Sequence, residues 1–148
     1  MKGIAQVKTK CIVKRAMIYF SILVFISSCD QNNGVTKLTG HEWVLKSIEP
    51  KDEDKVQVNK DEVYTLEFFE DYTITGQVNC NILSAYYESD KKENLKFKML
   101  TVTEKYCGDY YSHETLYLSA INITDSFQIV SNELVLFYED GKSKLVFK

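Results

Sequence analysis

The sequence predicts a mostly β domain with one short helix (α+β): a small antiparallel β-barrel, or a strongly curled sheet, covered by that helix. Three observations support this fold class. The chain of 148 residues contains ten Tyr and eight Phe, and aromatic residues favour strands. Short apolar segments, some of them alternating with polar residues, recur after residue 38. Turn-forming residues separate these segments at short spacing, which is typical of antiparallel sheets that close on themselves.

Each expected strand is bounded by charged or turn-forming residues. Pro50 and a run of charges end the first. The short Glu70–Asp71 turn joins the second and third, which predicts a hairpin. A charged segment separates the fourth and fifth, and the tight turn at Asp140–Gly141 precedes the last. In chain order, the expected strands are residues 43–48, 63–69, 72–78, 83–87, 95–100, 127–130, 134–138 and 145–147.

One segment has a helical period instead. Within residues 110–122, Leu116, Ala120 and Ile121 recur at the spacing of one helix face. Ser112 is expected to cap the start of this helix.

The first part of the chain has the organisation of an export signal. Residues 1–15 are basic, and residues 16–26 are apolar but too few to span a bilayer. The string Ile26-Ser27-Ser28-Cys29 is similar to a lipobox, so Cys29 is expected to carry lipid and to anchor the protein to a membrane. The alternative is an ordinary signal peptide with a Cys at its cleavage site. The expected organisation is a lipoprotein signal peptide (residues 1–28), a tether (29–37) and a domain (38–148).

Charge excludes one class of partner. The leader contains no acidic residue, so the rest of the chain carries 13 basic and 21 acidic side chains, a net charge of −8. Nucleic-acid binding requires clustered Lys and Arg, so no nucleic-acid partner is expected. The same acidity disfavours electrostatic docking on anionic lipid.

Cys80 and Cys107 are the thiols that remain in the domain. Disulfides persist in exported proteins, so a Cys80–Cys107 bridge is expected, with two buried thiols as the alternative. A metal site needs more ligands, and His41 and His113 do not lie at ligand spacing from a Cys, so no metal and no cofactor are expected.

No catalytic residues are expected. Neither histidine lies in a nucleophile-elbow motif. Glu67 and Glu70 are interpreted as a solvated face rather than an acid–base pair. The tyrosine pairs at 86/87 and 110/111 could line an aromatic pocket, but packing is the favoured interpretation.

The chain resembles META domains, the group that contains the heat-inducible HslJ lipoproteins. Residues 38–45 (LTGHEWVL) are similar to the family's opening "L-x-G-x-x-W-x-L", residues 76–81 (GQVNCN) to "G-x-x-G-C-N", and residues 103–107 (TEKYC) to "T-x-M-A-C". The residues of this chain that match these motifs include Trp43, Gly76, Asn81 and Thr103.

The resemblance implies a small antiparallel barrel with a helix and a pairing of the two cysteines. It implies no established catalytic residue and no accepted ligand. Asn79 and Ala85 stand where the family usually has Gly, which affects local turns, although Asn tolerates positive φ better than most residues.

The expected function is that of a non-enzymatic, membrane-anchored lipoprotein of the bacterial cell envelope. Its domain would lie outside the cytoplasm, with the choice of inner or outer membrane left open. The expected role is interaction with an envelope protein partner or a part in envelope stress. Two alternatives are a lipocalin-like carrier of a small apolar ligand and an inhibitor of an envelope hydrolase.

Overall fold

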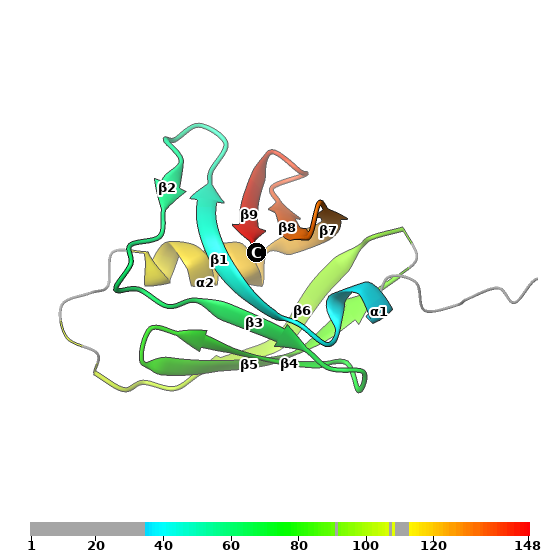
Figure 1. Ribbon diagram of the computed structural model, residues 1–148, viewed down its shortest axis with the longest axis horizontal. Coiled ribbons are helices and arrows are strands. Elements are labelled where there is room, and N and C mark those ends of the chain that lie inside the picture. Colours follow the sequence, from blue (N-terminus) through cyan, green and yellow to red (C-terminus); the bar gives the residue numbers. More distant parts are fainter. Residues whose placement is uncertain (1–34, 91, 107, 109–112) are drawn as a thin grey trace, which may run out of the picture.

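The computed structural model describes residues 35–90, 92–106, 108 and 113–148 (Figure 1). The described chain is dominated by antiparallel strands. The elements are α1 (Val35–Leu38), β1 (Glu42–Glu49), β2 (Val56–Gln57), β3 (Thr65–Phe68), β4 (Thr73–Val78), β5 (Asn81–Ser89), β6 (Leu95–Val102), α2 (Glu114–Asn122), β7 (Thr124–Val130), β8 (Glu133–Tyr138) and β9 (Ser143–Phe147).

The strands form one strongly curled sheet, a half-barrel, in the order β6-β5-β4-β3-β1-β9-β8-β7, with β2 added beside β1. All these pairings are antiparallel. The central strand β1 pairs with β3 through its first residues and with β9 farther along, with an irregularity between Leu45 and Ser47. Such an irregularity bends a strand and increases its twist, which turns the sheet from its first half into its second.

The two edge strands of the sheet meet at one point. Asn94, just before β6, bridges Ser126 of β7, and Phe127 N–H donates to Glu93 O at 2.8 Å. Figure 1 shows the sheet bending from the β3–β5 layer toward β7–β9, with α2 inside the bend. Tyr117, Ala120 and Ile121 of α2 are buried there. The helix therefore fills the concave side of the half-barrel.

The interior is packed with large side chains. Aromatic rings touch within it: Tyr64 lies 4.9 Å from Tyr117, and Phe68 lies 5.2 Å from Tyr87, between ring centroids. Close packing of such rings supplies much of the burial energy of a small domain. The largest fully buried side chains are Tyr64, Tyr87, Tyr117, Phe68, Phe127, Phe147, Leu38, Ile48, Leu66, Leu83, Leu95 and Ile121.

The fold class predicted from the sequence is confirmed in its second form, a strongly curled antiparallel sheet covered by a helix. The β3–β4 hairpin lies within the two segments where it was predicted. The helix begins at Glu114, after His113 at its N-cap, and His113 makes no side-chain capping hydrogen bond. The expected cap Ser112 lies outside the described residues. The two-residue strand β2 was not predicted, because so short a segment has no readable period.

Candidate functional site

Two residues of the family motif, Trp43 and Gly76, occupy positions that require those residue types. Trp43 is buried, and its Nε1–H donates to Leu38 O at 3.0 Å, which holds α1 against the sheet. Gly76 lies in β4 where the chain crosses close to β3. A Cβ atom on Gly76 would lie 2.1 Å from Thr65 O, a distance that side chains do not adopt. Only glycine fits at this position.

The other two motif residues form one hydrogen-bonded unit, which we call the Asn81 clamp. Asn81 Oδ1 accepts from Thr103 Oγ1 at 2.9 Å and from Lys105 N–H at 2.7 Å. Asn81 Nδ2 donates to Lys105 O at 3.2 Å. Thr103 Oγ1 in turn accepts from Ile82 N–H at 3.0 Å. The clamp fixes the chain that leaves β6 against the start of β5.

The expected disulfide lies beside this clamp. Cys80 Sγ is 3.8 Å from Lys105 O, two residues before Cys107 in the sequence. Cys107 and Cys29 both lie outside the described residues, so the bridge and the lipidation stay predictions.

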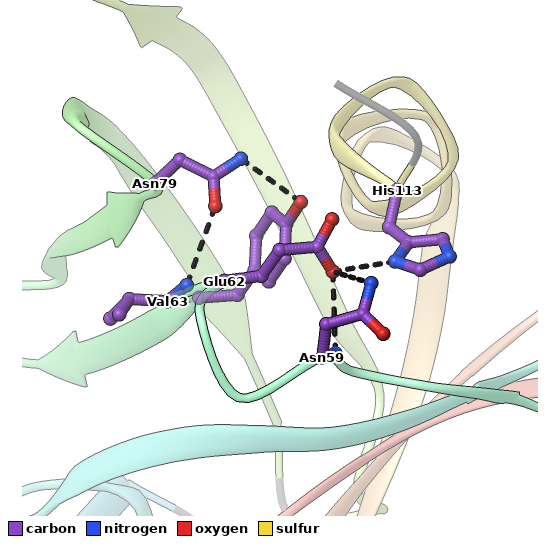
Figure 2. Close-up of polar contacts among 6 residues, drawn as sticks. Asn59, Glu62, Val63, Asn79 and His113 are labelled. Atoms are coloured by element: carbon purple, nitrogen blue, oxygen red, sulfur yellow. Dashed lines mark hydrogen bonds and ion pairs between the residues drawn. The ribbon is translucent and has the colours of Figure 1, made fainter. Parts of the chain in front are cut away.

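A second polar unit joins Glu62 to His113 (Figure 2). The Glu62 side chain is only 1% exposed and that of His113 is 19% exposed. His113 Nδ1 lies 2.6 Å from Glu62 Oε2. The same oxygen accepts from Asn59 N–H and Asn59 Nδ2, both at 3.4 Å. The connection before β3 is thereby attached to the start of α2.

The buried side chain of Tyr64 lies near this Glu62–His113 pair. Tyr64 Oη accepts from Asn79 Nδ2 at 3.1 Å, and Val63 N–H donates to Asn79 Oδ1 at 3.3 Å (Figure 2). Burial raises the pKa of Tyr64 to about 12; the Asn79 hydrogen bond opposes this rise, and the negative charge of Glu62 adds to it. Tyr64 therefore stays protonated at physiological pH.

The Glu62–His113 pair has the geometry by which a carboxylate orients an imidazole base. In the part of the chain that the structure describes, however, the imidazole contacts Glu62 and no serine or threonine hydroxyl or cysteine thiol lies within hydrogen-bond distance of it. Because the pair attaches the connection before β3 to the start of α2, we interpret it as a contact that stabilises the fold. Sequence reasoning missed it, because the partners are 51 residues apart and no local pattern relates them.

An open cleft of about 700 Å³ lies where the two sheet edges meet. Its lining comes from the end of β5, the start of β6 and the turn between them, from β7 and from the β8–β9 turn, and it includes one cationic side chain, Lys96. Ser89 Oγ is buried and has no hydrogen-bond partner among the described residues. The carboxylates that line this acidic cleft are those of Glu88, Asp90, Asp125 and Asp140.

The other residues considered from the sequence have ordinary positions. His41 is exposed, with its ring 5.3 Å from that of Trp43. Tyr87 is a core residue, whereas Tyr86 lies on the surface. Among the described residues, no group of three or more His, Cys, Asp or Glu side chains could hold a metal ion. No helix in the described ranges is long and apolar enough to cross a bilayer.

The chain matches the META domain family over residues 36–148. No curated protein matches. A solved protein from Burkholderia xenovorans is 18% identical, with a TM-score of 0.63 over 95% of this chain and 94% of its own. A DUF4847 family protein from Bacteroides vulgatus is 17% identical, with a TM-score of 0.57 over 74% of this chain and 92% of its own. At these identities, the two structures establish a shared fold.

Proposed function

This chain belongs to the META domain family, and from that premise we propose that it is a lipid-anchored, non-enzymatic lipoprotein of the cell envelope that binds a partner protein. The family is not known as one of enzymes. The proposed partner carries a cationic segment, which the acidic cleft receives.

The acidic cleft is the observation that carries the binding role. Its four carboxylates come from three separate segments. Lys96 lies in the lining, and two exposed lysines contact the cleft from outside it: Lys98 pairs with Glu88 at 3.0 Å and Lys142 with Asp140 at 3.8 Å. Carboxylates grouped in a concave surface concentrate the field and attract positively charged groups. The buried Ser89 hydroxyl, which has no partner in the described chain, offers a hydrogen bond at the same place.

The sequence supports the anchor. The string that ends at Cys29 is similar to a lipobox, and two acyl chains on one Cys would give durable attachment. The packed domain starts soon after this residue, since Leu38 is fully buried and bonded to Trp43. Lipid at Cys29 would therefore hold the domain close to a membrane surface.

The packed interior of the described domain does not suit a carrier of a small apolar ligand. A carrier needs an internal cavity, but buried aromatic and aliphatic side chains fill the concave side of the described half-barrel. No feature of the described surface favours inhibition of a hydrolase.

Two measurements test the proposal separately. The mass of the protein purified from its own membranes should show an acylated chain that begins at Cys29; an unmodified full-length mass would refute the anchor. For the cleft, we expect a hexalysine peptide to bind saturably in calorimetry and to bind more weakly as salt is raised.

A matched pair of variants locates the binding. Asp125→Asn with Asp140→Asn should weaken peptide binding by about tenfold, because two cleft charges are removed. Asp54→Asn with Asp61→Asn removes the same charge from exposed positions outside the cleft lining and should leave affinity nearly unchanged. Equal weakening by both pairs would reduce the interaction to net charge and refute the cleft as the site.

A further inference from the structure

Three apolar side chains gather on the outer face of the sheet, away from the core. Phe69, Tyr86 and Met99 are 38%, 53% and 78% exposed. They line a shallow groove of about 420 Å³ over β4, β5 and β6, together with Thr73, Thr75 and Thr101. We call this surface the apolar groove. A small domain gains no stability from apolar side chains left in water, so their exposure here points to a contact.

The backbone presents Met99 to solvent. β5 and β6 change register between Ser84 and Tyr86, and Met99 at the irregular position of β6 has a φ of +54°. Positive φ is unfavourable for a residue with a side chain. Bulges of this kind redirect a side chain within a strand. The most exposed large apolar side chain of the described surface therefore stands where the sheet turns it outward.

The groove lies at the end of the sheet from which the tether departs. Thr39, directly after α1, bridges Phe68, the neighbour of Phe69. In Figure 1, α1 and the β3–β4 turn lie at the same end of the molecule. From Cys29 to Val35 an extended chain spans at most about 20 Å. A domain anchored at Cys29 must therefore keep this end near the bilayer.

We propose that the apolar groove docks on the zwitterionic headgroup surface of the membrane that holds the lipid anchor. This inference rests on the proposed anchoring. Tyr and other aromatic side chains favour the membrane interface, and the anchor supplies a high local concentration of lipid surface. Exposed Glu70 and Asp71, in the turn beside Phe69, would be repelled by anionic lipid, which selects zwitterionic headgroups.

The sequence provides a single-site probe. Its methionines are Met1, Met17 and Met99, and cleavage before Cys29 removes the first two. The lipoprotein, labelled with carbon-13 in its methionine methyl groups, is reconstituted in phosphatidylcholine nanodiscs with a headgroup spin-labelled lipid. We expect one methyl resonance, from Met99, which loses most of its intensity to the spin label.

Matched variants locate the contact. A Met99→Leu, Gln57→Met variant moves the probe to exposed β2, which pairs with the far end of β1, and this methyl should stay sharp. Phe69→Ser with Tyr86→Ser should restore the Met99 signal, because it removes the other apolar members of the groove. Replacing part of the phosphatidylcholine by phosphatidylglycerol should also restore it.

The results separate docking from anchoring. A sharp Met99 methyl in protein that copurifies with the nanodiscs overturns docking and leaves the anchor intact. Three methyl resonances, or protein that does not associate with the discs, overturn the anchor and docking with it. Broadening that follows protein concentration and not the spin label assigns the groove to a second copy of the chain and overturns membrane docking.

Discussion

The Asn81 clamp and the Glu62–His113 pair are both polar contacts that fasten a connecting segment to the sheet, but they differ in what they bind. The clamp uses a side chain to bind main-chain groups of Lys105 and the hydroxyl of Thr103. The pair joins two ionisable side chains, one of them fully buried. The clamp is built from residues of the family motif, and the pair is not. The difference shows that these two motif residues, Asn81 and Thr103, hold main chain in place.

The largest expected effect comes from the motif glycine. Gly76→Ala should lower the free energy of unfolding by about 3 kcal/mol, because the added methyl collides with Thr65 O unless β3 and β4 separate. Urea denaturation measures this loss. Gly40→Ala, at a position with open space but φ of +78°, is the control for backbone strain alone and should cost less. Equal losses would refute the close approach as the reason for glycine.

The next largest loss of stability is expected from variants that break the Glu62–His113 pair. Glu62→Ala should destabilise the domain by about 2–3 kcal/mol, since it leaves the partly buried His113 and the Asn59 donors without their acceptor. Glu62→Gln retains an acceptor and should cost less. Glu70→Ala, at an exposed position of the β3–β4 turn, should change stability by less than about 0.5 kcal/mol. A negligible loss in Glu62→Ala would contradict the stabilising role assigned to this pair.

Substitutions in the Asn81 clamp should destabilise the domain slightly less than those in the Glu62–His113 pair. Asn81→Ala should lower the free energy of unfolding by about 2 kcal/mol, because its part-buried hydrogen bonds to Lys105 and Thr103 are lost. Combining Asn81→Ala with Thr103→Val in a double-mutant cycle should give a coupling of about 1 kcal/mol. Strict additivity of the two losses would show that the clamp is not one unit.

The smallest expected loss of stability involves Glu49, a carboxylate whose side chain is 21% exposed, in contrast to the buried Glu62. Burial alone would raise the pKa of Glu49, but hydrogen bonds from Lys55 and Lys144 lower it to about 2. A depressed pKa stabilises the fold above the ordinary glutamate range, and this stability is lost as the pH falls toward 2. Glu49→Gln should therefore cost about 1 kcal/mol at pH 7, and the difference from the parent should vanish near pH 2. A difference independent of pH would contradict this assignment.

The sequence by itself determined the fold class, the β3–β4 hairpin and the motif positions, because each depends on local period, turn chemistry or a short motif. It also marked Asn79, which stands in place of the family's usual glycine and has a φ of +53° in the structure. Alternation alone could not tell a closed barrel from a curled sheet. That outcome depends on where β1 exchanges its partner from β3 to β9 and on the bridge between Asn94, just before β6, and Ser126 of β7.

Only the tertiary structure decided which polar side chains meet. Glu62 and His113, the carboxylates of the acidic cleft and the members of the apolar groove come from segments with no shared local pattern, and the curl of the sheet brings each set together. A residue's alternation in a strand determines the face it occupies, but its neighbours across strands depend on register and curvature. The local sequence patterns therefore determined the strands, and the curvature of the sheet brought together the residues of the acidic cleft and the apolar groove.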